Sequence, residues 1–489
     1  MTAPEEEFAP GEDPRRWRAL VVTLAGGFLI LLDVSIVTVA VPSIQSSFGT
    51  SPSAVQWVVS GYPLTFGLIL VAGGRLGDQF GRRTMYVVGL CLFVATSVLA
   101  GAAQSMLMLI VARLLQGLAA GLVTPQNGGL IQDLFRGPER GRAFGLLGAM
   151  IGLSTAVGPV VGGVLIDAVG EPDGWRWVFL VNLPVGLVTI VLALLFVPKT
   201  PPRTTRTDLD PVGIVLLGVA VFCVLLPIVQ SDSGGFADLW WLFLVAVPFA
   251  VAFLGWEHGR VRRERSPLLD PRLFNATPGY PSGALIAGVY FCGFTGIFLV
   301  VAFYLQGTLG LSPLESGLVV TPFALGSAVS SFFAGRLVDR FGRWVTVAGL
   351  ATIAVGLGLV ALLVALIGTG DEGGNTVVWA ILAPLALAGV GGGAVISPNT
   401  TLTLAGVPPR MAGVASGVLQ TGQRIGTAVG TAVLAAVFHA FANPDNGFSM
   451  AMLAATLLIL VALGLAIAEL RGRRSQSENF RANTMVSGQ

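Results

Sequence analysis

The sequence predicts an all-α polytopic membrane protein with fourteen transmembrane helices arranged as six, two and six, and with both termini in the cytoplasm. Composition, the distribution of arginine and an internal repeat predict this fold class. Of the 489 residues, 54% are hydrophobic and 11% are charged, whereas soluble globular domains carry about 25% charged residues. Glycine occurs 65 times, and small residues let helix backbones approach closely in lipid. A water-soluble fold is therefore excluded.

Each predicted span meets the length requirement for crossing a bilayer, which is about 20 apolar residues. The spans form an N-terminal six-helix bundle (19–200), a two-helix insert (201–260) and a C-terminal six-helix bundle (261–471), flanked by cytoplasmic tails at 1–18 and 472–489. We expect the first span to be retained, because it is too long for a cleaved signal peptide. The predicted spans are 19–41, 54–75, 84–102, 107–129, 143–166, 176–197, 211–229, 239–257, 281–306, 316–338, 344–367, 376–403, 410–440 and 449–470.

The positive charges orient these spans. Cytoplasmic loops of membrane proteins carry an excess of Lys and Arg. Of the 28 positive residues, 25 fall on one side of the predicted topology and only Arg176 falls on the other, while Arg113 and Arg424 lie inside predicted helices. A miscount by one span would scramble this pattern, so the charges support both the count and the cytoplasmic termini.

An internal repeat supports the division into halves. Gly74–Arg83 recurs as Gly335–Trp344, with identity at seven of ten positions and an offset of 261 residues. Three residues of the preceding loop recur at the same offset. Transporters are commonly built from such repeated halves. The two spans between the halves then form an insert, and the sequence assigns no role to it.

The repeated segment predicts a cytoplasmic gate. It places a carboxylate and arginines at helix ends, where they can hold charge pairs across the interface between the halves. The alternative is a simple topology signal, which would not require Asp78 or the repeated glycines. The predicted gate residues are Gly74, Asp78, Gly81, Arg82, Arg83, Asp339, Arg340 and Arg343.

These motifs resemble those of the major facilitator superfamily, specifically its fourteen-span branch of drug:proton antiporters. Gly74–Arg83 is similar to the family's loop between helices two and three, Leu109–Gly117 to its helix-four motif, and Gly152–Leu165 to its antiporter motif in helix five. Leu32–Pro42 and Trp175–Pro184 are similar to motifs of the fourteen-span branch. The resemblance implies proton-coupled export of hydrophobic or amphipathic small molecules, such as drugs, antibiotics and toxic metabolites, by alternating access.

Asp33 and Arg113 are the predicted proton-coupling residues. Asp33 is the only acidic residue deep within a predicted span, and an ionisable group in the membrane is costly enough to suggest a function. Arg113 is the buried cation of the first half, and the resemblance ties its position to the proton path. The alternatives remain open: Asp33 capping a break in the first helix, and Arg113 binding helix carbonyls to fix packing.

The fifth predicted span carries a stripe of small residues. Gly148, Gly152, Thr155, Pro159 and Gly163 fall within one face at 100° per residue. Such a face allows close sliding against a partner helix, and the Gly158-Pro159 pair weakens the helical hydrogen bonds where a bend is possible. Through the resemblance this stripe favours exchange over symport, and ordinary close packing is compatible with it. The predicted antiporter-helix residues are Gly148, Gly152, Gly158, Pro159, Gly162 and Gly163.

A substrate cavity is predicted around aromatic residues of the ninth span. Tyr290, Phe294 and Phe298 recur every four residues and are candidates for lining a cavity that accepts apolar drugs. A packing or lipid-facing stripe is the alternative. Arg424 is a further candidate for the cavity, with a structural role as its alternative.

Several function classes are excluded or left open. A nucleotide-driven pump requires a phosphate-binding loop with a lysine, and the only lysine, Lys199, follows Pro198. No catalytic cluster is present, so we expect a secondary active transporter and not an enzyme. We expect no metal and no cofactor, because Cys91, Cys223 and Cys292 have no metal-ligand spacing. An uncoupled facilitator or a substrate-sensing membrane protein of the same fold remains the alternative.

The expected partners are a small-molecule substrate, protons and the lipid bilayer, with no nucleic acid, and the protein is expected to function as a monomer. The expected location is the plasma membrane of a bacterium, as a multi-pass protein, because 27 arginines against one lysine fit a GC-rich genome. The sequence does not name the substrate.

Overall fold

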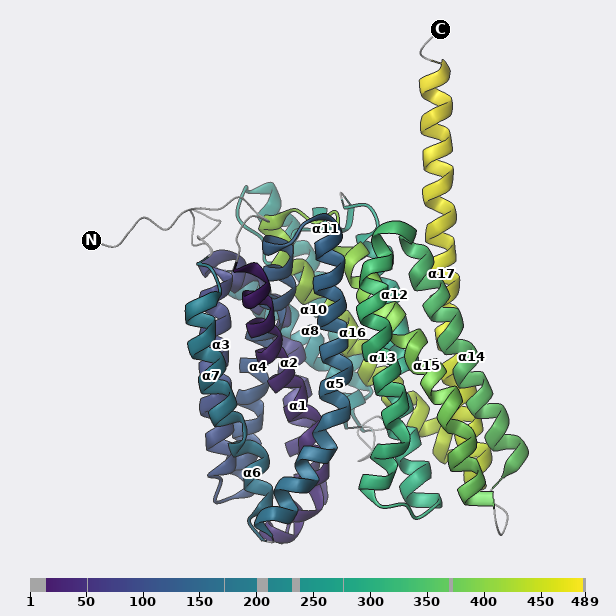
Figure 1. Cartoon of the computed structure of the whole chain (residues 1–489). Coiled ribbons are helices and arrows are strands. Elements are labelled where there is room, and N and C mark those ends of the chain that lie inside the picture. The colour runs from purple at the N-terminus through teal and green to yellow at the C-terminus, as the bar shows by residue number, and fades with distance from the viewer. Residues whose placement is uncertain are drawn as a thin grey trace.

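The computed structural model describes residues 15–50, 52–170, 172–199, 210–230, 238–275, 277–368 and 373–486. Residues 1–14 of the predicted N-terminal tail and residues 201–209 at the start of the predicted insert lie outside this part. Every regular element in the described ranges is helical. The helices form two groups that stand side by side in Figure 1, α1 to α7 in one and α12 to α17 in the other.

In the described part of the chain, the two groups are separated by three further helices. The first group comprises α1 (Arg16–Phe48), α2 (Pro52–Phe80), α3 (Arg82–Gly101), α4 (Met106–Leu134), α5 (Gly137–Val169), α6 (Gly174–Leu180) and α7 (Asn182–Phe196). Between the groups lie α8 (Pro211–Val229), α10 (Trp241–Arg262) and the short α11 (Arg272–Asn275). The second group comprises α12 (Tyr280–Ala302) with the π-helical turn η2 (Phe303–Thr308), α13 (Pro313–Phe341), α14 (Arg343–Ile367), α15 (Gly373–Leu404), η3 (Pro409–Met411), α16 (Ala412–His439) and α17 (Pro444–Val486).

Twelve helices of the described chain are long and apolar enough to cross a membrane, with α6 and α7 counted as one crossing. The sequence predicts fourteen crossings, and the two further helices are α5, in which the side chains at 155, 156 and 159 lie outside the described residues, and α16. Both are long, at 33 and 28 residues, and both pack inside the bundle, α5 against α1 and α13, and α16 against α2 and α12. The predicted count of fourteen stays a prediction.

Both ends of the helical chain leave the bundle on the same side. In Figure 1, α1 begins and α17 departs at the same end of the molecule, as an even number of crossings requires. The predicted tail 472–489 begins within α17, which continues as one helix to Val486. We call this end the gate end, because the connection between α2 and α3 with the predicted gate residues lies there.

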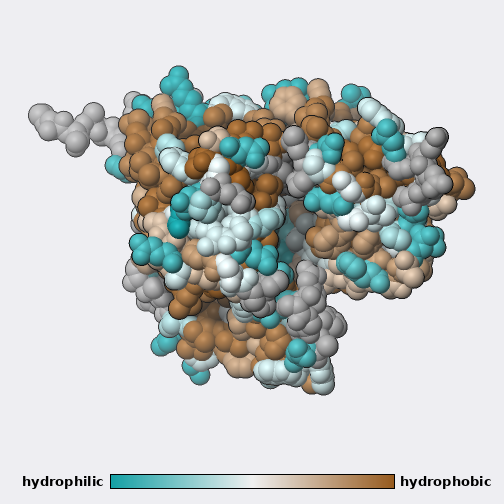
Figure 2. Space-filling view, turned by 90° about the horizontal axis from the view of Figure 1, so that it is seen from below, coloured by the Kyte–Doolittle hydropathy of each residue, from teal (hydrophilic) through white to brown (hydrophobic). Residues whose placement is uncertain are grey.

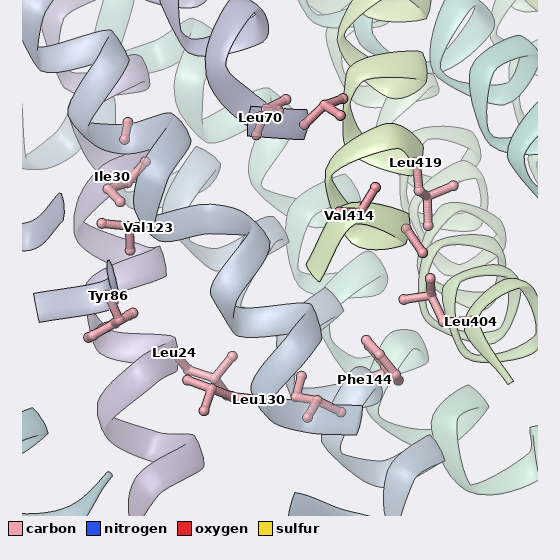
Figure 3. Packing of buried hydrophobic residues seen from close by; sticks show 14 of the residues in the cluster. Leu24, Ile30, Leu70, Tyr86, Val123, Leu130, Phe144, Leu404, Val414 and Leu419 are labelled. Carbon is pink, nitrogen blue, oxygen red and sulfur yellow. The ribbon is translucent and has the colours of Figure 1, made fainter. Parts of the chain in front are cut away.

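The two groups share an apolar core toward the gate end. Figure 3 shows residues of α1 to α5, among them Leu70 and Phe144, together with Leu404, Val414 and Leu419 from α15 and α16. A second apolar cluster is formed by buried residues of the second group alone. Large apolar side chains on the outside, such as Leu366 and Trp379, are at least 70% exposed, as expected for a surface solvated by lipid.

The inserted helices cover the seam between the two groups. α8 packs against α2 from the first group and α16 from the second, and α10 packs on α8. A small apolar core joins α2, α8 and α16 at Leu64, Leu225 and Ala428. The predicted insert therefore occupies a defined place on the seam, which the sequence did not indicate.

Candidate functional site

Asp33 lies at the centre of a buried hydrogen-bond network. Its side chain has no exposed surface. One oxygen, Oδ2, forms an ion pair with Nη1 of Arg113 at 2.5 Å, and the other, Oδ1, accepts hydrogen bonds from Gln116 Nε2 at 3.0 Å and Asn182 Nδ2 at 2.8 Å. Burial of a carboxylate is costly unless it is paired and hydrogen-bonded. The three donors, which come from α4 and α7, satisfy the ionised form.

Ser97 of α3 completes this network. Its hydroxyl accepts from Gln116 at 3.2 Å and Asn182 at 2.8 Å, and it donates to the carbonyl of Phe179 at 2.9 Å. Neither amide nor Ser97 was among the predicted site residues. Gln116 and Asn182 lie within the motifs of the fourth and sixth spans, so a polar amide inside an apolar span was the available signal. Ser97 gave none.

Arg113 contacts both the carboxylate and helix backbone. Besides Asp33, its guanidinium donates to Gln116 Oε1 at 2.7 Å and, through Nε, to the carbonyl of Val58 at 3.1 Å. Both interpretations of Arg113 therefore describe contacts that are present. The alternative role of Asp33, capping a break in the first helix, does not match the structure, because α1 runs unbroken from Arg16 to Phe48.

A column of rings connects this network to the second half. The Arg113 guanidinium lies 4.3 Å from the centre of the Tyr62 ring, and the rings of Tyr62 and Phe66 lie 5.9 Å apart. The guanidinium of Arg424 on α16 lies 4.4 Å from the Phe66 ring. Packed chains of this kind are able to carry a change from one site to another. We call Arg113, Tyr62, Phe66 and Arg424 the aromatic column.

A cavity of about 480 Å³ lies between the two halves. Drug-sized ligands occupy cavities of about 300–1,000 Å³ with mostly apolar walls and a few polar groups, and this one fits that description. It extends from Gln56 and Val229, at the end opposite the gate, to Ser416 near the gate. Other polar lining residues include Ser35, Ser60, Thr124, Asn127, Thr295, Ser397, Thr400, Gln420, Gln423, Arg424, Thr427 and Thr431.

Three of the four predicted cavity residues line this cavity. Phe294, Phe298 and Arg424 line it, but Tyr290 does not. Instead the Tyr290 hydroxyl donates to the carbonyl of Gly392 at 3.3 Å, and its ring stacks on Phe294. A spacing of four residues turns each position by about 40°, which carries Tyr290 into the packing behind Phe294. Tyr290 is therefore corrected to a supporting residue.

Asp33 does not line the cavity either, although its neighbours Leu31, Val34 and Ser35 do. The carboxylate points instead into the first half, toward α4 and α7. Figure 2, which views the end opposite the gate, shows a hollow between two lobes of the molecule. The proton site predicted from the sequence and the cavity thus lie on different faces of α1.

The predicted gate joins the halves through Asp78. Its carboxylate accepts from the backbone N–H groups of Gly413 and Val414 in the first turn of α16, both at 3.1 Å, and from Arg82 Nη2 at 2.8 Å. A carboxylate is favoured at a helix N-terminus by the unpaired N–H groups and the helix dipole. Arg82 also pairs with Asp133 at 2.7 Å and donates to the Pro409 carbonyl at 2.8 Å.

The repeated glycines form equivalent helix crossings. Gly74 of α2 lies against Gly413 of α16, and its counterpart Gly335 of α13 lies against Gly141 of α5. In each pair a Cβ atom on either glycine would collide with the backbone carbonyl oxygen of the other. Gly81 connects α2 to α3 with φ of 93°, a conformation that favours glycine. The repeat therefore encodes two closely packed contacts between the halves.

The remaining gate residues differ between the copies. Arg343 pairs with Glu469 of α17 at 2.8 Å and donates to Asn399, so it acts within the second half. Asp339 and Arg340 are exposed, and Asp339 experiences the charges of Arg140 and Arg142 on α5. Arg83 is half-buried and donates to the Leu194 carbonyl of α7 at 2.5 Å, within its own half.

The small residues of α5 face two partners and not one. Gly148 and Gly152 face α13, whereas Gly158 and Gly162 face Ser35 and Ile36 of α1. Six residues separate Gly152 from Gly158, which turns the helix by about 240°. Of the predicted stripe, Gly148 and Gly152 meet α13, Gly163 has open space beside it, and the side chains of Thr155 and Pro159 lie outside the described residues. The single face from 148 to 163 stays a prediction. The helix assignment is unbroken through this region.

Comparison with known proteins identifies the family. A sequence profile of the Major Facilitator Superfamily matches residues 23–259 and 283–486. The chain belongs to the major facilitator superfamily. Members of this superfamily are transporters, so the chain is a multi-pass membrane transporter of small molecules and not an enzyme.

Several relatives within the superfamily align over most of their length. A probable actinorhodin transporter of Streptomyces coelicolor is 37% identical, with 92% of this chain and 80% of the relative covered. The puromycin resistance protein of Streptomyces alboniger is 36% identical, with 87% and 82% covered. The tetracenomycin C resistance and export protein of Streptomyces glaucescens is 33% identical, with 86% and 75% covered.

Solved structures of the superfamily share the fold. The human organic anion transporter has a TM-score of 0.67 at 17% identity and covers 93% of this chain and 100% of its own. A proton:xylose symporter has a TM-score of 0.63 at 17% identity and covers 92% and 94%. At this identity the likeness establishes the fold alone.

Proposed function

We propose that the protein is a proton-coupled antiporter that exports hydrophobic or amphipathic small molecules across the plasma membrane by alternating access. The observation that carries the proposal is a buried, fully hydrogen-bonded carboxylate, Asp33, next to a cavity between two repeated halves. The relatives support the substrate class, because their names describe resistance to puromycin and export of tetracenomycin C.

In this proposal the described conformation faces outward. The halves touch at the gate end through Asp78 and through the paired glycines, while the cavity reaches the opposite end at Gln56 and Val229. Rocking of the halves about the cavity would open the gate end and close the other. We also propose the six, two and six arrangement of fourteen crossings, with α5 and α16 as the two further spans.

The coupling between proton and substrate is indirect in this scheme. Because Asp33 does not line the cavity, a substrate and a proton do not compete for the same carboxylate. Protonation would instead weaken the Asp33–Arg113 pair, and α1 and the aromatic column would pass the change to the cavity. A proton crossing 100 mV supplies about 2.3 kcal/mol, so one proton at about 150 mV sustains roughly a few-hundred-fold gradient of a neutral substrate.

A two-step experiment tests the function. A pump-deficient bacterial host with and without the protein is profiled against a panel of antibiotics that includes puromycin, and we expect higher resistance to at least one compound. That compound is then added to inverted vesicles with an acid interior, where antiport predicts alkalinisation of the lumen. Uptake of the compound without proton movement would favour the uncoupled facilitator, and an unchanged resistance profile would contradict export.

Arg113→Lys tests whether the guanidinium geometry matters. Lysine keeps the charge but loses the planar donors that reach Asp33, Gln116 and the Val58 carbonyl together. We expect drug-dependent proton flux to fall at least tenfold in inverted vesicles. Arg176→Lys is the matched control, because Arg176 also binds backbone carbonyls, those of Gly101 and Ala103, but pairs with Asp173 and not with Asp33. Equal flux in both variants would indicate that Arg113 only fixes packing.

A further inference from the structure

Arg424 carries a charge without a counter-ion in the described part of the chain. It lies in the cavity wall on α16, and its described contact is with the ring of Phe66, at 4.4 Å. In contrast, the buried arginines Arg82, Arg113 and Arg343 each pair with a carboxylate at 2.8 Å or less. A charge in a low-dielectric environment is costly without a partner, so a ligand that brings the missing negative charge would be favoured there.

The rest of the cavity leaves this positive charge unopposed. Among the described lining residues there is no Asp, Glu, Lys or His, so Arg424 sets the sign of the local potential. A cleft lined by one sign of charge with apolar walls concentrates ligands of the opposite sign. An organic cation would meet repulsion from Arg424 and would find no carboxylate on these walls.

The neighbouring side chains suit a flat, aromatic anion. Gln420, Arg424, Thr427 and Thr431 fall at offsets 0, 4, 7 and 11, which places them on one face of α16. The adjacent helix α12 contributes phenylalanines, including Phe294 and Phe298, to the same cavity. A planar guanidinium binds carboxylates and similar anions through two parallel hydrogen bonds, and the phenylalanine rings provide stacking surfaces.

We propose that Arg424 binds the anionic group of an aromatic substrate and that the cavity therefore selects aromatic anions over organic cations. This proposal rests on the export function proposed above and specifies its substrate class. The polar face of α16 orients the anionic group, and the phenylalanines of α12 hold the rings.

Two dyes with the same three-ring core and opposite charge test the selectivity: fluorescein, an anion at neutral pH, and rhodamine 123, a cation. Binding to the purified full-length protein is measured by fluorescence polarisation. We expect wild type to bind fluorescein at least tenfold more tightly than rhodamine 123, and Arg424→Gln to reduce fluorescein affinity at least tenfold, because a charge-assisted hydrogen bond is lost. Arg424→Lys, which keeps the charge, should retain most of the preference.

Arg410→Gln is the matched control, because it removes the same charge from an exposed residue outside the cavity, and it should bind both dyes as wild type does. Retained rhodamine 123 binding by Arg424→Gln would show that the variant is folded. Equal affinity of wild type for the two dyes, absence of fluorescein binding, or an unchanged preference in Arg424→Gln would overturn the proposal.

The dye experiment separates this proposal from the proposed function. Proton-coupled export of rhodamine 123 in inverted vesicles, with no effect of Arg424→Gln, would leave antiport standing and remove the anion selectivity. Arg424-dependent fluorescein binding without proton movement during fluorescein uptake would support the selectivity and contradict antiport.

Discussion

Asp33→Asn is expected to abolish drug-dependent proton flux in inverted vesicles while leaving substrate affinity within about threefold of wild type. Asparagine has nearly the same shape as aspartate, but its amide cannot take up and release a proton as a carboxylate does. Because the Asp33 side chain lies outside the cavity wall, the variant should bind substrate normally and fail only in coupling. This separation of binding from proton movement distinguishes a proton site from a substrate ligand.

The variant also leaves Arg113 buried without its counter-ion, and breaking a buried ion pair costs about 3–5 kcal/mol. A double variant, Asp33→Asn with Arg113→Gln, removes both charges and controls for that loss of stability. We expect the double variant to express at wild-type levels, to bind substrate and to move no protons. Full proton flux in either variant would contradict the assignment of Asp33 as the proton site.

Gly74→Ala is expected to open the gate end and to reduce transport at least tenfold. A Cβ at this position would lie 2.6 Å from the carbonyl carbon of Gly413 and 3.0 Å from the amide nitrogen of Val414, so relief requires α2 and α16 to separate. The same movement would break the hydrogen bonds from Gly413 and Val414 to Asp78. The population should therefore shift toward conformations in which the gate is open.

Spin labels on the exposed positions 84 and 410, in a background without the native cysteines, measure this opening by pulsed electron paramagnetic resonance. We expect the distance distribution to lengthen by several ångströms relative to the labelled wild type. Gly358→Ala is the control, because nothing lies within 4 Å of its added Cβ on α14. Gly335→Ala should act like Gly74→Ala, since Gly335 meets the Gly141 carbonyl in the same way. An unchanged distribution in both gate variants would contradict a closed gate held by these crossings.

Local sequence patterns predicted much of the fold. Apolar runs located the helices because the bilayer imposes a minimum length on each crossing. The glycines of the repeat were recognised as structural because one motif occurred twice, and both copies meet a glycine of the opposite half. The helix α16 was harder to assess by hydropathy, because its glycines serve contacts within the protein and not with lipid.

The functional residues divide in the same way. Asp33 and Arg113 stood out because an ionisable residue in an apolar span is rare enough to be noticed alone, and the structure places them in one ion pair. Ser97 is not distinctive in any sequence window, and it belongs to the network only because α3, α4 and α7 converge on α1. Tyr290 shares the four-residue spacing of Phe294 and Phe298, but its side chain does not line the cavity.

Properties that depend on neighbouring residues in the chain were readable in advance: the membrane class, the repeated halves, the orienting charges and the rare buried ions. Properties that depend on which helices meet were decided by packing: the two partners of α5, the place of α8 on the seam, and the separation of Asp33 from the cavity by the two faces of α1. The physical reason is that helix periodicity identifies a face, whereas only the close packing of distant helices selects what that face contacts.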